Sequence, residues 1–437
     1  MNNFLTSLPN RVRALCFIPF FSLYSHASVE LPPPGATRLL EVSIVKGAQL
    51  PALLNKSVSD YSLIAVHKGE LIPIPYQFDD KNIRGLTYVE GALLEVDGQA
   101  GVLEAQDELV FMYKDMGVQA KASLLKKVSG TIIAELQITD NNSDRYAYII
   151  SGNSERSGKI YSHYDMKTGL VETESYRLQT DPKNLLVLSD WIIKDFGSPP
   201  TPTNILDTLK MRVKAKLGFS ATVNNEKIPA KALAVKNGPV RSIVEADTSI
   251  TILGVNLGKG AVSATFSAQA MEYPVFITLP KAAGVLGSLA IELTLDYVNF
   301  EGSRYRTALG PKQPMITGTK EAAVQRQNYK SDLDNPWVSI SSGKNWDMFL
   351  LFRHQDNFRP ILNALYKDVS AGDKPNKPER FKGSNSEIGI SLSDIPVGVE
   401  TLLNYNLYFG PGLWKGDDVD SALSKLENPA TVRVNPL

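Results

Sequence analysis

Residues 130–151 have the sequence GTIIAELQITDNNSDRYAYIIS, and this stretch decides the fold class. Its outer segments, 130–139 and 145–151, are rich in β-branched and aromatic residues, which favour strands. Residues 140–144, between them, are Asp, Asn and Ser, which favour turns. The pattern therefore predicts two neighbouring strands joined by a short connection.

The segments that precede this pair have the same character. Pro73 and Pro75 interrupt one of them, and because proline cannot donate a hydrogen bond to a neighbouring strand, that segment is expected at a sheet edge or beside a bulge. Short strands with no helical period between them predict an all-β fold, beginning with an immunoglobulin-like sandwich over residues 28–155. Its other strands are predicted at residues 39–45, 61–67, 71–78 and 109–113.

A larger domain is predicted over residues 156–437. Residues 151–158 contain no large apolar side chain and mark the boundary. The strands that follow are longer, which predicts a larger antiparallel sandwich or supersandwich with few short helices. One helix is expected at residues 419–426, ended by Pro429. The longest strands are predicted at residues 209–219, 240–252, 261–271 and 288–300.

One of these strands has an unusual alternation. Residues 209–219, LKMRVKAKLGF, alternate apolar and basic side chains with the period of a strand, so all of the basic residues lie on one face. That face either lines a positive groove or is a solvated strand face, and the second interpretation is preferred.

The N-terminus has the features of an export signal. Arg11 and Arg13 precede an apolar run over residues 14–24, and residues 25–27 (SHA) place small side chains where a signal peptidase cleaves. We therefore expect residues 1–27 to be removed and the protein to be periplasmic or secreted.

The composition excludes several classes of site and partner. The only cysteine, Cys16, lies within the expected signal, so the exported product would have no disulfide and no cysteine-ligated metal centre. Lys plus Arg and Asp plus Glu both number 46, so no net charge recruits nucleic acid. Beyond residue 27 no apolar run approaches the roughly 18 residues of a membrane helix. We expect no nucleic-acid partner, no membrane span and no cofactor.

Acidic residues concentrate around Gly98 and Gly101. Oxygen-rich loops with glycine can bind calcium, but the spacing does not match the twelve-residue calcium loop. A solvated acidic turn is the preferred interpretation, and no metal site is predicted. The residues concerned are Glu95, Asp97, Glu104, Asp107 and Glu108.

The candidate catalytic residues are His163, Tyr164 and Arg177. If they shared one cleft, the arginine could neutralise the carboxylate of a uronic acid while the histidine or tyrosine moved the neighbouring proton, as a polysaccharide lyase or epimerase requires. The preferred interpretation is a surface histidine next to two tyrosines on a strand.

The candidate ligand-binding residues are Trp337, Trp346, Trp414 and His354. Tryptophans near loop ends provide flat apolar faces on which a sugar ring can stack. The alternative is that these tryptophans fill the core.

Two motifs carry a family resemblance. Residues 72–80 (IPIPYQFDD) and 107–115 (DELVFMYKD) resemble exported bacterial β-sandwich proteins, which are distantly similar to polysaccharide-processing proteins with a mutarotase-like supersandwich. Residues 237–241 (NGPVR), before a long strand, are similar too. The resemblance implies an exported β-sandwich protein and transfers no catalytic residue.

Three functions remain open on the sequence. The preferred hypothesis is binding of a glycan or other envelope polymer through a cleft in the larger domain. The others are a lyase or epimerase-like activity and a structural accessory role in the cell envelope. Titratable groups converging in a pocket would favour the enzyme, and an open groove would favour binding.

Overall fold

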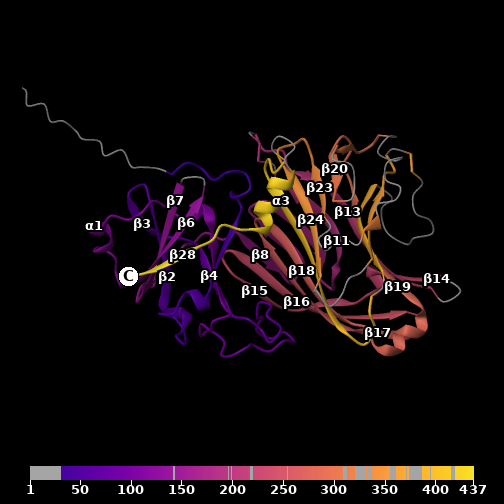
Figure 1. Ribbon diagram of the computed structural model, residues 1–437, viewed down its shortest axis with the longest axis horizontal. Coiled ribbons are helices and arrows are strands. Elements are labelled where there is room, and N and C mark those ends of the chain that lie inside the picture. Colours follow the sequence, from indigo (N-terminus) through magenta and orange to yellow (C-terminus); the bar gives the residue numbers. More distant parts are fainter. Residues whose placement is uncertain are drawn as a thin grey trace, which may run out of the picture.

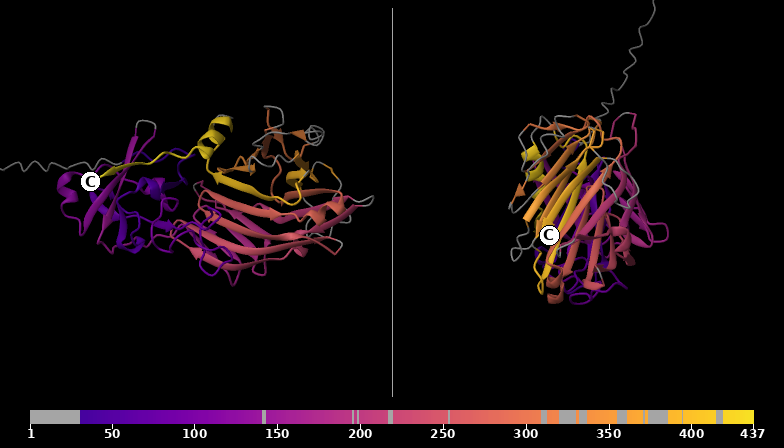
Figure 2. Two further views of the ribbon diagram at one scale, coloured as in Figure 1. Left: turned by 60° about the horizontal axis from the view of Figure 1, so that its bottom comes forward. Right: turned by 90° about the vertical axis from the view of Figure 1, so that its right-hand side faces the viewer.

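The computed structural model describes residues 31–140, 143–194, 196–197, 199–216, 220–252, 254–308, 313–319, 330–331, 337–354, 361–370, 372–373, 386–393, 395–414 and 419–437. The expected signal, residues 1–27, lies outside the described residues. Within them the chain forms antiparallel sheets of three, five, five, six and nine strands, and the predicted all-β class is confirmed. Two sheets form an N-terminal domain at one end of the molecule, and three form a larger domain (Figures 1 and 2).

The N-terminal domain is a two-sheet sandwich. Its core joins Leu109 and Phe111 of the smaller sheet to Leu63, Leu136 and Ile149 of the larger one. The smaller sheet has the order β1 (Val42–Lys46), β5 (Glu108–Met112) and β4 (Tyr76–Asp79). The larger has the order β28 (Arg433–Pro436), β6 (Thr131–Asp140), β7 (Ser143–Ser151), β2 (Tyr61–His67) and β3 (Glu70–Pro73).

The predicted strand 71–78 is two strands in the structure. The chain leaves β3 at Pro73, crosses from one sheet to the other, and enters β4 at Tyr76. Both strands lie at sheet edges, as the prolines predicted. An edge strand tolerates proline because its outer side has no neighbouring strand to which a backbone N–H must donate.

The last strand closes the N-terminal domain rather than the larger one. β28 pairs with β6, with Val434 opposite Leu136. Val432, just before it, is 3% exposed and belongs to the N-terminal core. The sequence pattern did not predict this return, which is visible as the yellow strand beside β6 in Figure 1.

The larger domain surrounds one extensive core. A nine-stranded sheet faces the six-stranded sheet and the second five-stranded sheet, and apolar side chains from all three meet between them. The nine-stranded sheet has the order β15 (Ala230–Asn237), β16 (Arg241–Ile252), β17 (Val255–Ser267), β18 (Ala270–Thr278), β27 (Glu400–Gly410), β24 (Asp347–His354), β23 (Trp337–Ser341), β20 (Arg304–Thr307) and β21 (Met315–Ile316).

The sheets that face it are shorter. The six-stranded sheet has the order β14 (Ser220–Asn224), β13 (Leu206–Lys216), β19 (Ser288–Tyr297), β26 (Ser386–Ser393), β25 (Ile361–Lys367) and β22 (Lys330–Ser331). The five-stranded sheet has the order β12 (Thr203–Asn204), β11 (Asn184–Ile193), β10 (Tyr176–Asp181), β9 (Leu170–Thr173) and β8 (Ser162–Asp165).

At Lys210 and Arg212 the basic face of β13 is neither a positive groove nor a solvated face, whereas the side chain of Lys214 is 41% exposed. The side chains of Lys210 and Arg212 are 3% and 2% exposed. Lys210 lies 2.8 Å from Asp296 and 3.0 Å from Glu387, and Arg212 lies 2.9 Å from Glu387. Acidic residues on β19 and β26 therefore neutralise this face, a pairing that the sequence of one strand cannot reveal.

Helices are short in the described part of the chain. They are α1 (Ala122–Leu125), α3 (Val419–Glu427) and several 3₁₀ turns. The predicted C-terminal helix is confirmed as α3, which packs Leu423 and Leu426 against Phe349 and Leu351 of β24. Among the described residues, no helix has the length and apolar character to span a membrane.

Candidate functional site

A polar cleft lies between the N-terminal domain and the outer face of the nine-stranded sheet. It consists of two adjoining cavities of about 350 and 270 Å³. Ile44, Arg241, Glu272 and Asn406 line both of them, so we treat them as one site and call it the interdomain cleft.

Strand alternation places the polar side chains in the cleft. Along β27, Leu403, Tyr405 and Leu407 are buried in the core, whereas Asn404 and Asn406 are half-buried and line the cleft. Tyr408 continues the same face toward α3. Glu272 of β18 lies opposite Asn406 and opposite Thr265 of β17, which together form a polar row across three neighbouring strands.

The walls come from the N-terminal domain and from the end of α3. Lys81 and Glu108 form the wall on the N-terminal side. On the other side Arg353 of β24 pairs with Glu427 at the end of α3. The site therefore depends on segments far apart in the sequence, which meet only when the two domains are docked.

Arg241 joins the domains at the floor of the cleft. Its Nε lies 2.8 Å from Asp79 Oδ2, and its second terminal nitrogen lies 2.6 Å from Glu108 Oε2. Lys81 lies 2.9 Å from Glu108, and Lys236 lies 2.9 Å from Asp79. Asp79 is fully buried, so this cluster combines strong charge pairing with near-complete loss of water.

The two glutamates of the cleft differ in their tendency to hold a proton. Burial raises the pKa of Glu272, and the nearby Arg241 offsets this only in part. Burial also tends to raise the pKa of Glu108, but the nearby Arg241 and Lys81 lower it by more. They hold the pKa of that carboxyl well below its usual range. Two carboxyls of opposite protonation tendency in one site are an arrangement that acid–base catalysis uses.

The acidic turn is organised by backbone hydrogen bonds. Asp107 accepts from the amide of Lys81 at 2.8 Å and from the amide of Glu104 at 2.6 Å. Glu104 accepts from the amide of Gln99 at 2.9 Å. No group of three or more His, Cys, Asp or Glu side chains positioned to hold a metal occurs among the described residues.

The predicted catalytic residues lie on two faces of one sheet. His163 on β8 and Arg177 on β10 both lie opposite Glu172 of β9, on the exposed face. Tyr164, the next residue along β8, points into the core and is 1% exposed. The structure thus brings His163 and Arg177 to one face, with Arg177 3.9 Å from Glu172, and places Tyr164 on the other.

The predicted ligand-binding residues do not share one rim. Trp346 is 5% exposed and belongs to the main core. Trp414, also 5% exposed, and the half-buried Trp337 pack in the cluster beneath α3. His354 ends β24, with its ring 6.4 Å from that of Phe352.

Sequence reasoning missed the cleft residues. Residues 400–410 have the sequence ETLLNYNLYFG, in which the polar Asn404 and Asn406 alternate with Leu403, Tyr405 and Leu407. That alternation indicates a polar outer face. It cannot show that the N-terminal domain covers this face. That depends on contacts between residues far apart in the chain, such as Arg241 and Asp79.

No protein-family model matches the chain, and no curated protein matches it. Among solved structures, an α-mannosidase from Enterococcus faecalis V583 is similar, with 10% sequence identity, a TM-score of 0.46, and coverage of 91% of this chain and 44% of that one. A glycosyl hydrolase family 38 protein from Enterococcus faecalis gives 10% identity, a TM-score of 0.45 and coverage of 91% and 45%. The chain thus spans less than half the length of these structures, and we infer neither activity nor substrate from them.

Proposed function

We propose that the protein binds a glycan or another hydroxyl-rich envelope polymer in the interdomain cleft. The observation that carries this proposal is the row of neutral and charged polar side chains, Thr265, Glu272 and Asn406, along the cleft floor. Sugar hydroxyls both donate and accept hydrogen bonds, and amide and carboxylate side chains offer both kinds of partner. The ring of Tyr408 adds an apolar face at one end.

A binding assay with cleft variants tests the proposal. Wild-type protein is applied to a glycan array and to isolated envelope polysaccharides. Asn406→Ala combined with Asn404→Ala removes two amides from the floor and is expected to weaken binding about five- to thirty-fold, at roughly 1 kcal/mol for each hydrogen bond. Asn363→Ala, on β25 of the six-stranded sheet, is the matched control. No binding by the wild type, or equal losses in both variants, would overturn the proposal.

A second candidate function is acid–base cleavage of the bound polymer. The opposed pKa directions of Glu272 and Glu108 favour it, since a protonated carboxyl can donate to a leaving oxygen while an ionised one stabilises positive charge. Glu272→Gln keeps the shape of the side chain but removes its proton transfer. Loss of product release with binding intact would support catalysis, whereas binding without product in the wild type would exclude it.

Export from the cytoplasm is also part of the proposal. The sequence of residues 1–27 supports it. Expression of the full chain in a bacterial host, followed by mass spectrometry of the periplasmic fraction, should give a product that begins at Ser28. Retention of residues 1–27 in a cytosolic product would contradict it.

A further inference from the structure

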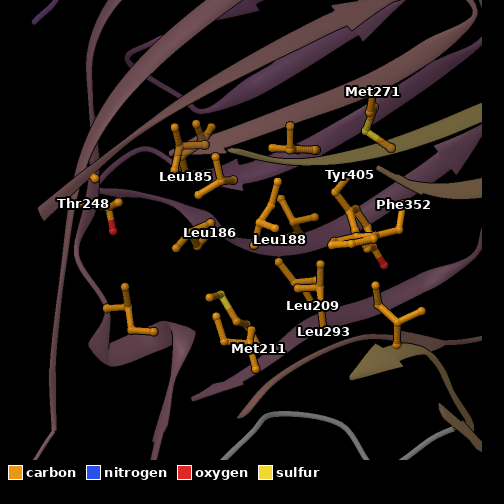
Figure 3. A pocket seen from close by; sticks show the side chains of 18 of the residues that line it. Leu185, Leu186, Leu188, Leu209, Met211, Thr248, Met271, Leu293, Phe352 and Tyr405 are labelled. Atoms are coloured by element: carbon orange, nitrogen blue, oxygen red, sulfur yellow. The ribbon is translucent and has the colours of Figure 1, made fainter. Parts of the chain in front are cut away.

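A separate cavity, of about 130 Å³, lies inside the larger domain between the nine-stranded sheet and the sheets that face it. We call it the core cavity. Figure 3 shows side chains from β11, β13, β16 and β27 converging on it, among them Leu186, Met211, Thr248 and Tyr405. It lies on the opposite face of the nine-stranded sheet from the interdomain cleft, because Tyr405 and Asn406 point to opposite sides of β27.

The lining of the core cavity is almost entirely apolar. Leucine, isoleucine, valine and methionine predominate, and no charged side chain lines it. Protein interiors normally have few voids larger than a water molecule. An engineered apolar cavity of about 150 Å³ in another protein stays dry and binds benzene, so a space of this size can hold an apolar ligand.

Four polar atoms of the lining residues have no partner within the described part of the chain. They are Trp191 Nε1, Thr248 Oγ1, Tyr273 OH and Tyr405 OH. Trp191 is 0% exposed, Tyr405 7% and Thr248 8%. Buried donors without acceptors are uncommon in native proteins and unfavourable. The acceptor of a bound ligand would satisfy one of them.

The core cavity suits a short ligand. Its volume of about 130 Å³ is slightly below that of the cavity that holds benzene, so it has room for about six carbon atoms. Thr248 on β16 and Phe352 on β24 lie at opposite ends of its lining in Figure 3. Two methionines, Met211 and Met271, give the lining an adaptable surface.

We propose that the core cavity binds a short-chain acyl ester, whose carbonyl oxygen accepts a hydrogen bond from the Tyr405 hydroxyl. An ionised carboxylate would enter an apolar space with no cation in its lining, which is strongly unfavourable. An ester or a protonated acid avoids that penalty. Burial raises the pKa of the Tyr405 hydroxyl, so it remains a donor across the physiological range.

The experiment compares three probes on purified full-length protein: methyl butanoate, pentane and butanoate at pH 8. Native mass spectrometry measures occupancy, and thermal denaturation measures the shift in Tm. Methyl butanoate is expected to bind about three- to ten-fold more tightly than pentane, which corresponds to one net hydrogen bond, and butanoate more weakly than either. Tyr405→Phe should remove most of the difference between methyl butanoate and pentane.

A filling variant separates this site from surface binding. Leu186→Trp places a large ring in the core cavity and should abolish binding of methyl butanoate. Val187→Trp, the neighbouring position on β11 that does not line the cavity, is the control and should bind as the wild type does. Absence of binding in the wild type, equal binding of methyl butanoate and pentane, or undiminished binding in a folded Leu186→Trp variant would each overturn the proposal.

Discussion

Replacing Arg241 with methionine tests the idea that a buried charge cluster holds the two domains together. The variant keeps the length of the side chain but removes two charge-assisted hydrogen bonds, to Asp79 at 2.8 Å and to Glu108 at 2.6 Å. Removing one partner of a buried pair typically costs about 3–5 kcal/mol, because the other charge stays buried without compensation. Asp79 is fully buried and retains only Lys236 as a cationic partner, so we expect about 4 kcal/mol.

The effect of Arg241→Met should depend on pH. Burial opposes ionisation of Asp79, but Arg241 and Lys236 outweigh it and lower its pKa, and Arg241 lowers the pKa of Glu108 as well. Groups whose pKa is lower in the folded state stabilise it above the unfolded pKa, about 4, and lose that contribution as pH falls. The difference between wild type and variant should therefore be largest near pH 7 and shrink below pH 4.

Urea denaturation at pH 7 and pH 3.5 measures both quantities. All four tryptophans follow residue 190, so their fluorescence reports the larger domain, and far-UV circular dichroism reports the whole chain. Arg177→Met is the control, because Arg177 is 53% exposed and lies 3.9 Å from Glu172, and a change within about 0.5 kcal/mol is expected. A loss below about 1 kcal/mol at pH 7, or a loss independent of pH, would refute the reasoning.

Three further predictions concern other parts of the chain. The free energy of unfolding of Asp296→Asn, relative to that of the wild type, should rise by about 2–3 kcal/mol between pH 4 and pH 7. Burial raises the pKa of Asp296 to about 6, so the wild type loses stability as that group ionises. Urea denaturation at several pH values measures this difference. Deletion of residues 430–437 removes β28 and the buried Val432, and limited proteolysis should then cut the N-terminal domain faster while the larger domain stays protected. Gly117→Ala should lower the free energy of unfolding by about 1–3 kcal/mol in urea denaturation, since the added carbon would lie 2.0 Å from the carbonyl oxygen of Val66.

The sequence predicted those features that depend on local pattern. The two segments of residues 130–151 that are rich in β-branched and aromatic side chains form β6 and β7, and Pro73 and Pro75 lie where the chain crosses between two edge strands. The predicted strand 261–271 was wrong at its end, because β17 stops at Ser267 and β18 begins at Ala270. A turn there has no Gly, Pro, Asn or Asp to mark it, so the sequence contains no local signal for the break.

The candidate site could not be predicted because its residues meet only through tertiary structure. His163 and Tyr164 are adjacent in the sequence, yet strand geometry sends them to opposite faces. Asp79 and Arg241, by contrast, are far apart in the sequence and within 2.8 Å in space. Proximity in the chain is therefore a poor guide to a β-protein site, in which cross-strand and interdomain neighbours determine the chemistry.

A final prediction follows from the position of Gln77, which docks the domains without lining the interdomain cleft. Its Oε1 accepts from the amides of Val240 at 3.0 Å and Arg241 at 2.9 Å. Gln77→Leu would leave both buried amides without this acceptor, at a cost of about 1–3 kcal/mol for each.

If the ligand needs both walls of the cleft, Gln77→Leu should also weaken glycan binding although it removes no ligand contact. Saturating ligand should in turn restore part of the lost stability, since a ligand at 100 times its Kd stabilises the docked state by about 2.7 kcal/mol. Unchanged affinity in this variant would mean that the nine-stranded sheet alone carries the binding.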